Sequence, residues 1–306
     1  MNIQGNPNFK TDSVQVNGLA FSWIELGSGL LVLALHGFPD LPRTFRYQMQ
    51  ALAQAGYRVV APYMRGYFPT DAPPTVSYER AALTQDTLGL IDVLSDQPII
   101  LIGHDWGAAA AYGAALLAPE KIAKLITIAV PYGETWWNAL ITNPAQQRRS
   151  WYIYFFQMPF AETAVAHDDF AFLERLWQDW SPGWAYPPED LQAVKDTFRK
   201  PGVLTAALNY YRHSFNSAQS DPALKAIRER HGEPIAVPTL YVHGARDGGI
   251  GVETTVGMEG WFQNGLQKWI IAEAGHFVHQ EQPDIVNRLI LEFIQPELKT
   301  AVSERA

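Results

Sequence analysis

Short apolar segments alternate with helical patterns along most of this chain, and this alternation limits the fold more than any other feature. Residues 43–55, 78–94 and 106–118 have the spacing of helices. Parallel strands need such crossover helices, so the pattern is typical of an α/β protein with a mostly parallel sheet covered on both faces. The segments that we interpret as buried strands are residues 31–35, 58–61, 98–102, 125–130, 238–242 and 268–272.

Two further strand segments, residues 14–16 and 20–25, lie near the N-terminus and are separated by Asn17-Gly18. Asn-Gly is a typical turn of a tight β-hairpin. We therefore expect an antiparallel edge on an otherwise parallel, doubly wound sheet of eight strands.

A helical insertion interrupts the alternation near Pro131, and the strands resume near Pro238. We expect a core formed by residues 1–133 and 236–306, and a cap formed by residues 134–235. Aromatic side chains are crowded in this cap, which indicates an apolar cavity beneath it. They include Trp136, Trp137, Trp151, Tyr152, Tyr154, Phe155, Phe156, Trp177, Trp180, Trp184, Tyr210 and Tyr211.

The composition excludes several classes of protein. The chain of 306 residues has a net charge of −8 and no cysteine, so a thiolate zinc site and a cysteine nucleophile are excluded. It has no basic run suited to phosphate contacts, and we expect no nucleic-acid partner. Residues 108–118, the longest apolar stretch, are too short to span a bilayer, and residues 1–10 do not resemble a signal peptide. We therefore expect a cytoplasmic enzyme with no membrane partner.

The strongest local motif joins the predicted strand 98–102 to the predicted helix 106–118. A strand that runs into Gly-x-nucleophile-x-Gly and then a helix is a nucleophile elbow. An aspartate, Asp105, occupies the nucleophile position here, where the free N–H groups of the helix favour an anion. A simple capping aspartate is the alternative interpretation of the same residues. The motif is Gly103-His104-Asp105-Trp106-Gly107.

Two later residues complete the order nucleophile, acid, histidine that this kind of site requires. Asp247 follows the strand 238–242, and His276 follows the strand 268–272. Both therefore lie past the carboxyl ends of strands, where doubly wound sheets bind ligands. Of the eight histidines, His276 alone combines a strand end, a preceding glycine and a following amphipathic helix. Glu134 is the alternative acid, which we rank lower because Asp247 alone stands in the triad order.

A tight turn, residues 36–40, follows the predicted strand 31–35. The backbone N–H of Phe38, with that of Trp106, is placed to form an oxyanion hole. Taken alone, these residues could be only a turn.

Together the motifs resemble those of the α/β-hydrolase-fold epoxide hydrolases, over about residues 31–294. The resemblance implies an α/β-hydrolase fold with an inserted helical cap and an aspartate nucleophile. Haloalkane dehalogenases share the core motifs, so these leave the reaction open. One departure is Ala108, where relatives often carry a second glycine. The matching residues are His36-Gly37-Phe38-Pro39-Asp40, Arg65-Gly66-Tyr67, Gly103-His104-Asp105-Trp106-Gly107, Asp247 and Gly275-His276-Phe277.

In this family two cap tyrosines donate hydrogen bonds to the epoxide oxygen. The spacing to Gln157 and the Asn-x-Tyr-Arg order match these to Tyr152 and Tyr211. Tyr154 and Tyr210 are the alternatives, but offsets of one or two residues do not share a helix face.

The resemblance implies that Asp105 opens a small apolar epoxide to form an ester, with Tyr152 and Tyr211 as acids. A carboxylate suits attack at an sp³ carbon because its ester keeps a carbonyl that water can attack. His276, oriented by Asp247, would activate that water. No metal or organic cofactor is required, and monomer and homodimer both stay open. Residues expected to contact substrate are His36, Pro39 and Trp106.

Two rival functions use the same fold. A haloalkane dehalogenase shares the elbow but needs halide-binding donors, and the Asn or Arg that some such enzymes carry at the positions of Phe38 and Trp106 is not present. A non-catalytic receptor for small molecules is the rival of another class. A complete nucleophile, acid, histidine and oxyanion hole argue against a pure binder.

Overall fold

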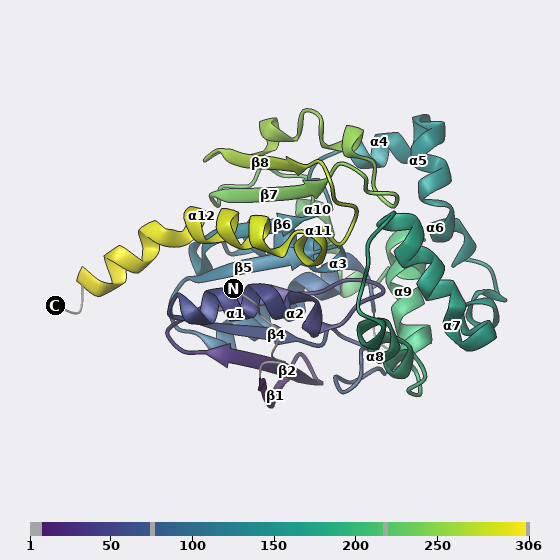
Figure 1. The fold of residues 1–306 in the computed structure, drawn as a ribbon, viewed down its shortest axis with the longest axis horizontal. Helices are drawn as coiled ribbons and strands as arrows, with labels where there is room; N and C mark the ends of the chain where they lie inside the picture. The colour runs from purple at the N-terminus through teal and green to yellow at the C-terminus, as the bar shows by residue number, and fades with distance from the viewer. Residues whose placement is uncertain (1–7, 74–76, 217–219, 304–306) are drawn as a thin grey trace.

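Within residues 8–73, 77–216 and 220–303, which the computed structural model describes, eight strands form one sheet (Figure 1). In spatial order the strands are β1 (Lys10–Val16), β2 (Leu19–Gly27), β4 (Tyr57–Pro62), β3 (Leu30–Leu35), β5 (Ile99–His104), β6 (Ile122–Ile128), β7 (Thr239–Gly244) and β8 (Leu266–Ile271).

The predicted combination of an antiparallel edge and a parallel centre is confirmed. β2 pairs antiparallel with both β1 and β4, and the remaining neighbours pair in parallel. The hairpin turn between β1 and β2 places Asn17 and Gly18 at φ values of 52° and 78°. Asparagine and glycine tolerate this left-handed backbone, so the local sequence sets the turn.

The prediction of a buried strand at residues 268–272 is wrong. Trp269 of β8 is 48% exposed and Ile270 is 39% exposed. Within the described ranges β8 pairs with β7 alone, at the edge of the sheet. Apolar composition does not reveal where a strand lies within a sheet.

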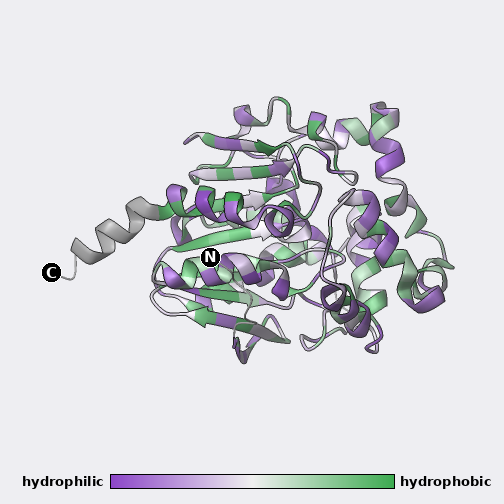
Figure 2. Cartoon of the chain, viewed as in Figure 1, coloured by the Kyte–Doolittle hydropathy of each residue, from purple (hydrophilic) through white to green (hydrophobic). Residues whose placement is uncertain are grey.

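Helices cover both faces of the sheet, as expected for a doubly wound fold. α1 (Arg46–Gln54) and α12 (Pro283–Ser303) lie on one face, and α2 (Arg80–Leu94) and α3 (Trp106–Leu117) lie on the other (Figure 1). In β3, Val32 packs toward α1 and α12 while Leu33 packs toward α2 and α3, because side chains alternate along a strand. Figure 2 accordingly shows strands that are mostly hydrophobic and outer helices of mixed hydropathy.

Two predicted helices differ at their ends from those observed. The pattern at residues 43–55 begins as a short 3₁₀ turn, Pro42–Phe45, before α1 starts at Arg46. The helix predicted at the C-terminus continues past Ile294 to Ser303 as α12. Helix ends are the least defined part of a periodic pattern.

The insertion between β6 and β7 forms a helical layer beyond the carboxyl ends of the central strands (Figure 1). The backbone of its long helix is not helical at residues 167–170, where Asp168 and Asp169 have positive φ, so this helix consists of two segments. The helices are α4 (Thr135–Thr142), α5 (Pro144–Arg149), α6 (Trp151–Phe155), α7 (Ala161–Trp180), α8 (Pro188–Phe198) and α9 (Val203–Phe215).

The chain returns to the core before β7. Leu224 packs on Ala81 and Ala82 of α2, just before α10 (Lys225–Arg230). The last part of the predicted cap range, 134–235, therefore contacts the core, and the cap bounds stay a prediction.

Buried polar contacts fix the cap above the turn at residues 36–40. Asp190 of α8 pairs with Arg46 at 2.7 Å and with Arg43 at 2.9 Å. The indole N–H of Trp177 donates to the carbonyl of Pro39 at 3.0 Å. Breaking a buried ion pair leaves an uncompensated charge, so these contacts hold the cap in one position.

In the part of the chain that the structure describes, each helix is too short or too polar to cross a bilayer.

Candidate active site

Asp105 stands in the turn between β5 and α3, in a conformation that few non-glycine residues adopt. Its φ and ψ are 52° and −119°, and the side chain is 7% exposed. Position 107 must be glycine, because a Cβ there would lie 2.0 Å from the carbonyl oxygen of Leu35. Backbone strain of this kind persists only where the surrounding structure holds it. The strand, turn and helix thus present the Asp105 carboxylate at the N-terminus of α3.

One oxygen of this carboxylate already accepts a hydrogen bond from the predicted oxyanion hole. The N–H of Phe38 lies 2.8 Å from Asp105 Oδ1. Phe38 follows β3, which pairs with β5, so the sheet brings the two turns together. The described contacts of Asp105 include no hydrogen bond from the N–H of Trp106, whose part in the hole stays a prediction. A donor at Oδ1 is placed where an oxyanion would form.

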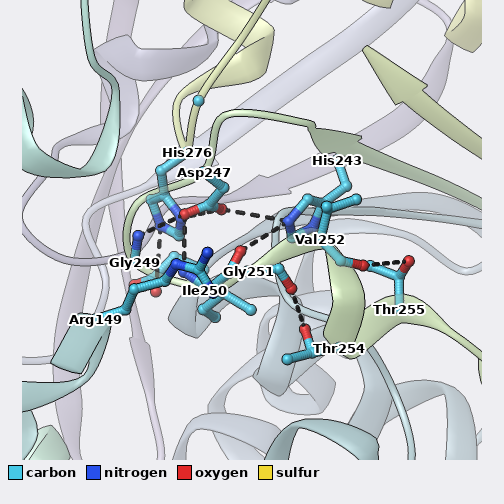
Figure 3. A network of polar contacts seen from close by, with 12 residues as sticks. Arg149, His243, Asp247, Gly249, Ile250, Gly251, Val252, Thr254, Thr255 and His276 are labelled. Atoms are coloured by element: carbon cyan, nitrogen blue, oxygen red, sulfur yellow. Dashed lines mark hydrogen bonds and ion pairs between the residues drawn. The ribbon is translucent and has the colours of Figure 1, made fainter. Parts of the chain in front are cut away.

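His276 and Asp247 meet beside Asp105. Asp247 Oδ2 accepts a hydrogen bond from His276 Nδ1 at 2.8 Å, and Asp247 Oδ1 accepts from the N–H groups of Gly249 and Ile250, each at 2.8 Å (Figure 3). His276 Nε2 lies 3.6 Å from Asp105 Oδ2. A carboxylate that binds Nδ1–H leaves Nε2 able to accept a proton.

Other candidates for the acid and the base lie elsewhere. Glu134 is exposed next to α4, and the described residues show no contact between it and His276. Asp247 lies between His276 and His243, whose Nε2 is 3.6 Å from Asp247 Oδ2 (Figure 3). Burial lowers the pKa of His243. His104 bonds through Nε2 to the backbone carbonyl of His276 at 3.0 Å.

The charges around His276 favour its protonated form in the resting site. Burial alone would lower its pKa, but the carboxylates of Asp247 and Asp105 outweigh burial and raise the pKa from 6.5 to about 10. When Asp105 carries an ester it has no charge, so only the charge of Asp247 then raises the pKa of His276. The pKa of His276 then falls toward the range in which imidazole acts as a base.

The predicted phenols, Tyr152 of α6 and Tyr211 of α9, are both buried, and their rings lie 5.6 Å apart and nearly perpendicular. The ring of Tyr211 also lies 5.1 Å from Trp106. Its hydroxyl is buried and makes no hydrogen bond of normal geometry to the described residues, although a contact with the Trp106 side chain acts to lower its pKa. Burial, and then the charge of Asp105, raise the pKa of both phenols well above the ordinary value, so both are neutral acids.

The alternative tyrosines have different surroundings. Tyr154 is 51% exposed on the outside of α6. Tyr210 is buried, but its hydroxyl donates to the carbonyl of Arg65 at 2.7 Å. Tyr210 would have to break this hydrogen bond to turn toward Asp105, and Tyr154 faces solvent.

The residues predicted to contact substrate lie in the turn after β3 and at the start of α3. The His36 ring is buried, with Nδ1 2.9 Å from the Gly37 carbonyl and Nε2 accepting from the N–H of Met64 at 3.0 Å. The Pro39 carbonyl accepts from the Trp177 indole, and Trp106 is the first residue of α3. Their contact with a substrate stays a prediction.

Aromatic rings enclose the site from the cap. The ring of Phe38 contacts the rings of Phe156, Trp180, Phe198 and Tyr211 at centroid distances from 5.3 to 6.3 Å. Rings packed in this way make the surroundings of Phe38 apolar, and the apolar cavity predicted beneath the cap stays a prediction.

One residue that the sequence analysis gave no role is Tyr67, in the turn after β4. Its hydroxyl is buried, and among the described residues it has no hydrogen-bond partner. Burial, and then the charges of Asp105 and Asp40, raise the pKa of Tyr67. The matched stretch Arg65-Gly66-Tyr67 was the available signal, but a tyrosine in a turn does not show where its hydroxyl lies.

Known proteins share this fold and much of this sequence. The family described as alpha/beta hydrolase fold matches residues 31–283. Epoxide hydrolase 4 of Homo sapiens is 34% identical over 295 residues, which cover 94% of this chain and 78% of that protein. The AB hydrolase superfamily protein YfhM of Bacillus subtilis (strain 168) is 32% identical over 291 residues, with 94% and 98% covered.

Solved structures of epoxide hydrolases have a similar fold. The epoxide hydrolase of Bacillus megaterium, crystallised in complex with an inhibitor, has a TM-score of 0.80 and 29% identity, with 93% of this chain and 100% of that chain covered. Epoxide hydrolase VrEH1 from Vigna radiata also has a TM-score of 0.80 and 29% identity, with 94% and 98% covered. The chain therefore belongs to the α/β-hydrolase-fold family and, within it, to the epoxide hydrolases.

Proposed function

We propose that this protein hydrolyses small apolar epoxides to vicinal diols through a covalent ester on Asp105. The proposal rests on one observation above all. Two buried phenols, Tyr152 and Tyr211, contact each other, and the Tyr211 ring packs on Phe38 and Trp106 beside the Asp105 carboxylate, which also contacts the Phe38 N–H and His276. Ring opening needs a nucleophile and an acid at once, because alkoxide is a poor leaving group.

In the first step Asp105 Oδ2 attacks a ring carbon, and the bond between that carbon and the epoxide oxygen breaks. The developing alkoxide takes a proton from Tyr152 or Tyr211. Oδ1 stays bound to the N–H of Phe38 and becomes the carbonyl oxygen of the ester. Neutral phenols are suited to this task because their pKa is raised.

In the second step His276 Nε2 takes a proton from water, and the hydroxide adds to the ester carbonyl of Asp105. Asp247 stabilises the imidazolium that forms. The Phe38 N–H, with that of Trp106, stabilises the oxyanion. The acyl–oxygen bond then breaks, His276 returns its proton to the departing diol oxygen, and the regenerated carboxylic acid reprotonates the phenolate. The sum is addition of one water, and neither step needs a metal or an organic cofactor.

A substrate comparison tests the reaction against the dehalogenase alternative. We expect styrene oxide to give a diol, and 1-chlorobutane to release no halide, because phenols suit an epoxide oxygen better than a halide. Product analysis and halide titration measure both. Halide release without diol formation would reverse the assignment.

The covalent step has a separate test. The variant His276→Gln should open styrene oxide but not hydrolyse the ester, so mass spectrometry should find the adduct on Asp105. In wild-type protein, a single turnover in ¹⁸O-labelled water with excess enzyme should place the label in the Asp105 side chain. Label that enters the diol directly would contradict the ester mechanism. If the His276→Gln variant forms no adduct with any reactive epoxide, the receptor alternative would be favoured.

A further inference from the structure

The C-terminal end of cap helix α7 reaches between the two loops that carry the acid and the histidine. The backbone carbonyl of Trp180 accepts hydrogen bonds from the N–H of Gly248, next to Asp247, and from the N–H of His276, both at 3.0 Å. A single cap carbonyl therefore joins the two loops at the residues that matter for proton transfer. The Trp180 ring also lies 5.1 Å from the ring of His276.

The core loops leave room for this cap segment only because glycine occupies two positions. A Cβ on Gly248 would lie 1.9 Å from the carbonyl oxygen of Asp179. A Cβ on Gly275 would lie 2.5 Å from the carbonyl oxygen of Trp180 and 2.5 Å from the Cα of Ser181. The glycine that precedes the histidine in the sequence motif thus permits close approach of the cap backbone.

A side-chain pair completes the contact. Ser181 Oγ donates to Glu281 Oε1 at 2.7 Å and accepts from the N–H of Phe277 at 3.1 Å. Glu281 Oε2 accepts from the N–H of Gly275 at 2.8 Å. The three consecutive N–H groups of residues 275–277 are therefore bound by Glu281, the Trp180 carbonyl and Ser181, two of which belong to the cap.

We propose that Ser181 and Glu281 are positioning residues that orient His276 for ester hydrolysis. In this way a cap residue helps to hold the catalytic base in place. This inference rests on the proposed function. Ring opening uses Asp105 and the phenols. The Trp180 ring packs on Tyr152, but the side chains of Ser181 and Glu281 bond only to each other and to the N–H groups of Gly275 and Phe277. Ester hydrolysis instead requires His276 Nε2 to face a water molecule, and a small displacement of a reacting group is costly.

The test measures the two half-reactions separately in the full-length protein. With styrene oxide in single-turnover, acid-quenched samples, mass spectrometry follows formation and decay of the Asp105 ester. For Ser181→Ala we expect ring opening within about twofold of wild type and ester decay at least about tenfold slower. Ester should then accumulate in the steady state. Ser181→Thr keeps the hydroxyl and should restore ester decay.

Glu281→Gln provides a second variant of nearly unchanged volume. One acceptor oxygen becomes an NH₂ group, so either the Gly275 N–H or the Ser181 hydroxyl faces a donor. Ester decay should slow as in Ser181→Ala. This variant keeps the inference testable if Ser181→Ala does not fold.

Matched controls separate positioning from general loss of stability. Thr197→Val removes a buried cap hydroxyl that bonds within its own helix, to Ala193. Glu79→Gln removes the charge of a buried carboxylate that pairs with Arg228 at 2.9 Å, away from the loops that carry Asp247 and His276. We expect both controls to keep the wild-type ratio of ester formation to decay, whatever their thermal stability.

Two results would overturn the inference. Ser181→Ala and Glu281→Gln could slow ring opening and ester decay equally, which indicates a structural role, or they could leave both rates at the wild-type values. If His276→Gln accumulates ester while these variants behave as wild type, the inference fails and the proposed function stands. If no variant, His276→Gln included, forms an ester, the proposed function fails first.

Discussion

The acid–base pair and the phenols differ in how completely their polar atoms are bound. Asp247 accepts three hydrogen bonds, from His276 and from two backbone N–H groups. The hydroxyls of Tyr211 and Tyr67 are buried, yet neither has a partner among the described residues. Both groups lie close enough to Asp105 for its charge to raise their pKa values.

In the proposed mechanism, this difference separates the atoms that hold other groups in place from the atoms that react. A buried polar group without a partner costs free energy, so such groups are few and are often functional. In the acid–base pair the unbound atom is His276 Nε2, the one that takes a proton from water in the proposed mechanism. In Tyr211 it is the hydroxyl, one of the two groups that would bind the epoxide oxygen in the proposed mechanism. Stability and reactivity are thus assigned to different atoms of the same site.

The largest effect should follow from Asp247→Asn. The amide oxygen can keep the bonds from Gly249 and Ile250, but the NH₂ group would face His276 Nδ1. The ring must then carry its proton on Nε2 and cannot accept one from water. We expect ester decay to slow by about 10⁴-fold, as for loss of a buried triad carboxylate, with little change in ring opening. Single-turnover mass spectrometry measures both rates, and unchanged ester decay would contradict the assignment of the acid.

Replacing both phenols should affect the other step. For the double variant Tyr152→Phe, Tyr211→Phe we expect ring opening to slow by about 10²- to 10⁴-fold, the usual contribution of general acids. Because the Tyr211 hydroxyl makes no hydrogen bond of normal geometry and only a weak contact with the Trp106 side chain, Tyr211→Phe alone should lower the free energy of unfolding by less than about 0.5 kcal/mol.

Tyr210→Phe is the matched control for this comparison. It removes a hydrogen bond to the Arg65 carbonyl, so it should lower the free energy of unfolding by about 1 kcal/mol and leave ring opening unchanged. Denaturant titration and ester formation measure the two quantities. If Tyr210 were needed for ring opening and Tyr211 were not, the roles assigned to these two tyrosines would have to be exchanged.

The pH dependence of stability tests the charges around His276. Its folded pKa, about 10, is higher than its ordinary 6.5, so its contribution to stability is fully present below pH 6.5 and is lost as pH rises toward 10. In Asp105→Asn one of the two carboxylates is gone, the pKa of His276 is raised less, and the loss should be complete at a lower pH. Thermal unfolding of both proteins between pH 6 and pH 10 measures this. Parallel curves would mean that Asp105 does not interact with His276.

The smallest effect should follow from Tyr67→Phe. The hydroxyl has no partner among the described residues, so the free energy of unfolding should change by less than about 0.5 kcal/mol. Ring opening should slow by less than tenfold, because Tyr152 and Tyr211 remain. A loss of more than about 1 kcal/mol would show that the Tyr67 hydroxyl has a hydrogen-bond partner in solution, as the atoms of Asp247 do.

Much of the fold could be predicted because its signals are local. Runs of Val, Ile and Leu indicate strands buried on both faces, and Asn17-Gly18 indicates a hairpin. The triad residues could be selected because each follows a strand, and parallel strands bring their carboxyl ends to one edge. The exposure of Trp269 and Ile270 could not be predicted in this way, since an edge strand and a central strand can have the same composition.

The sequence by itself determined the strands and the elbow, because both depend on the conformational preferences of a few neighbouring residues. The order in which Asp105, Asp247 and His276 occur is also a property of the sequence alone. Only the tertiary structure decided which side chains meet. Ser181 binds the backbone N–H of Phe277 across 96 positions of chain, and Tyr211 is free while Tyr210 is bound. Such contacts depend on how the cap packs on the core, and packing joins residues that share no local pattern.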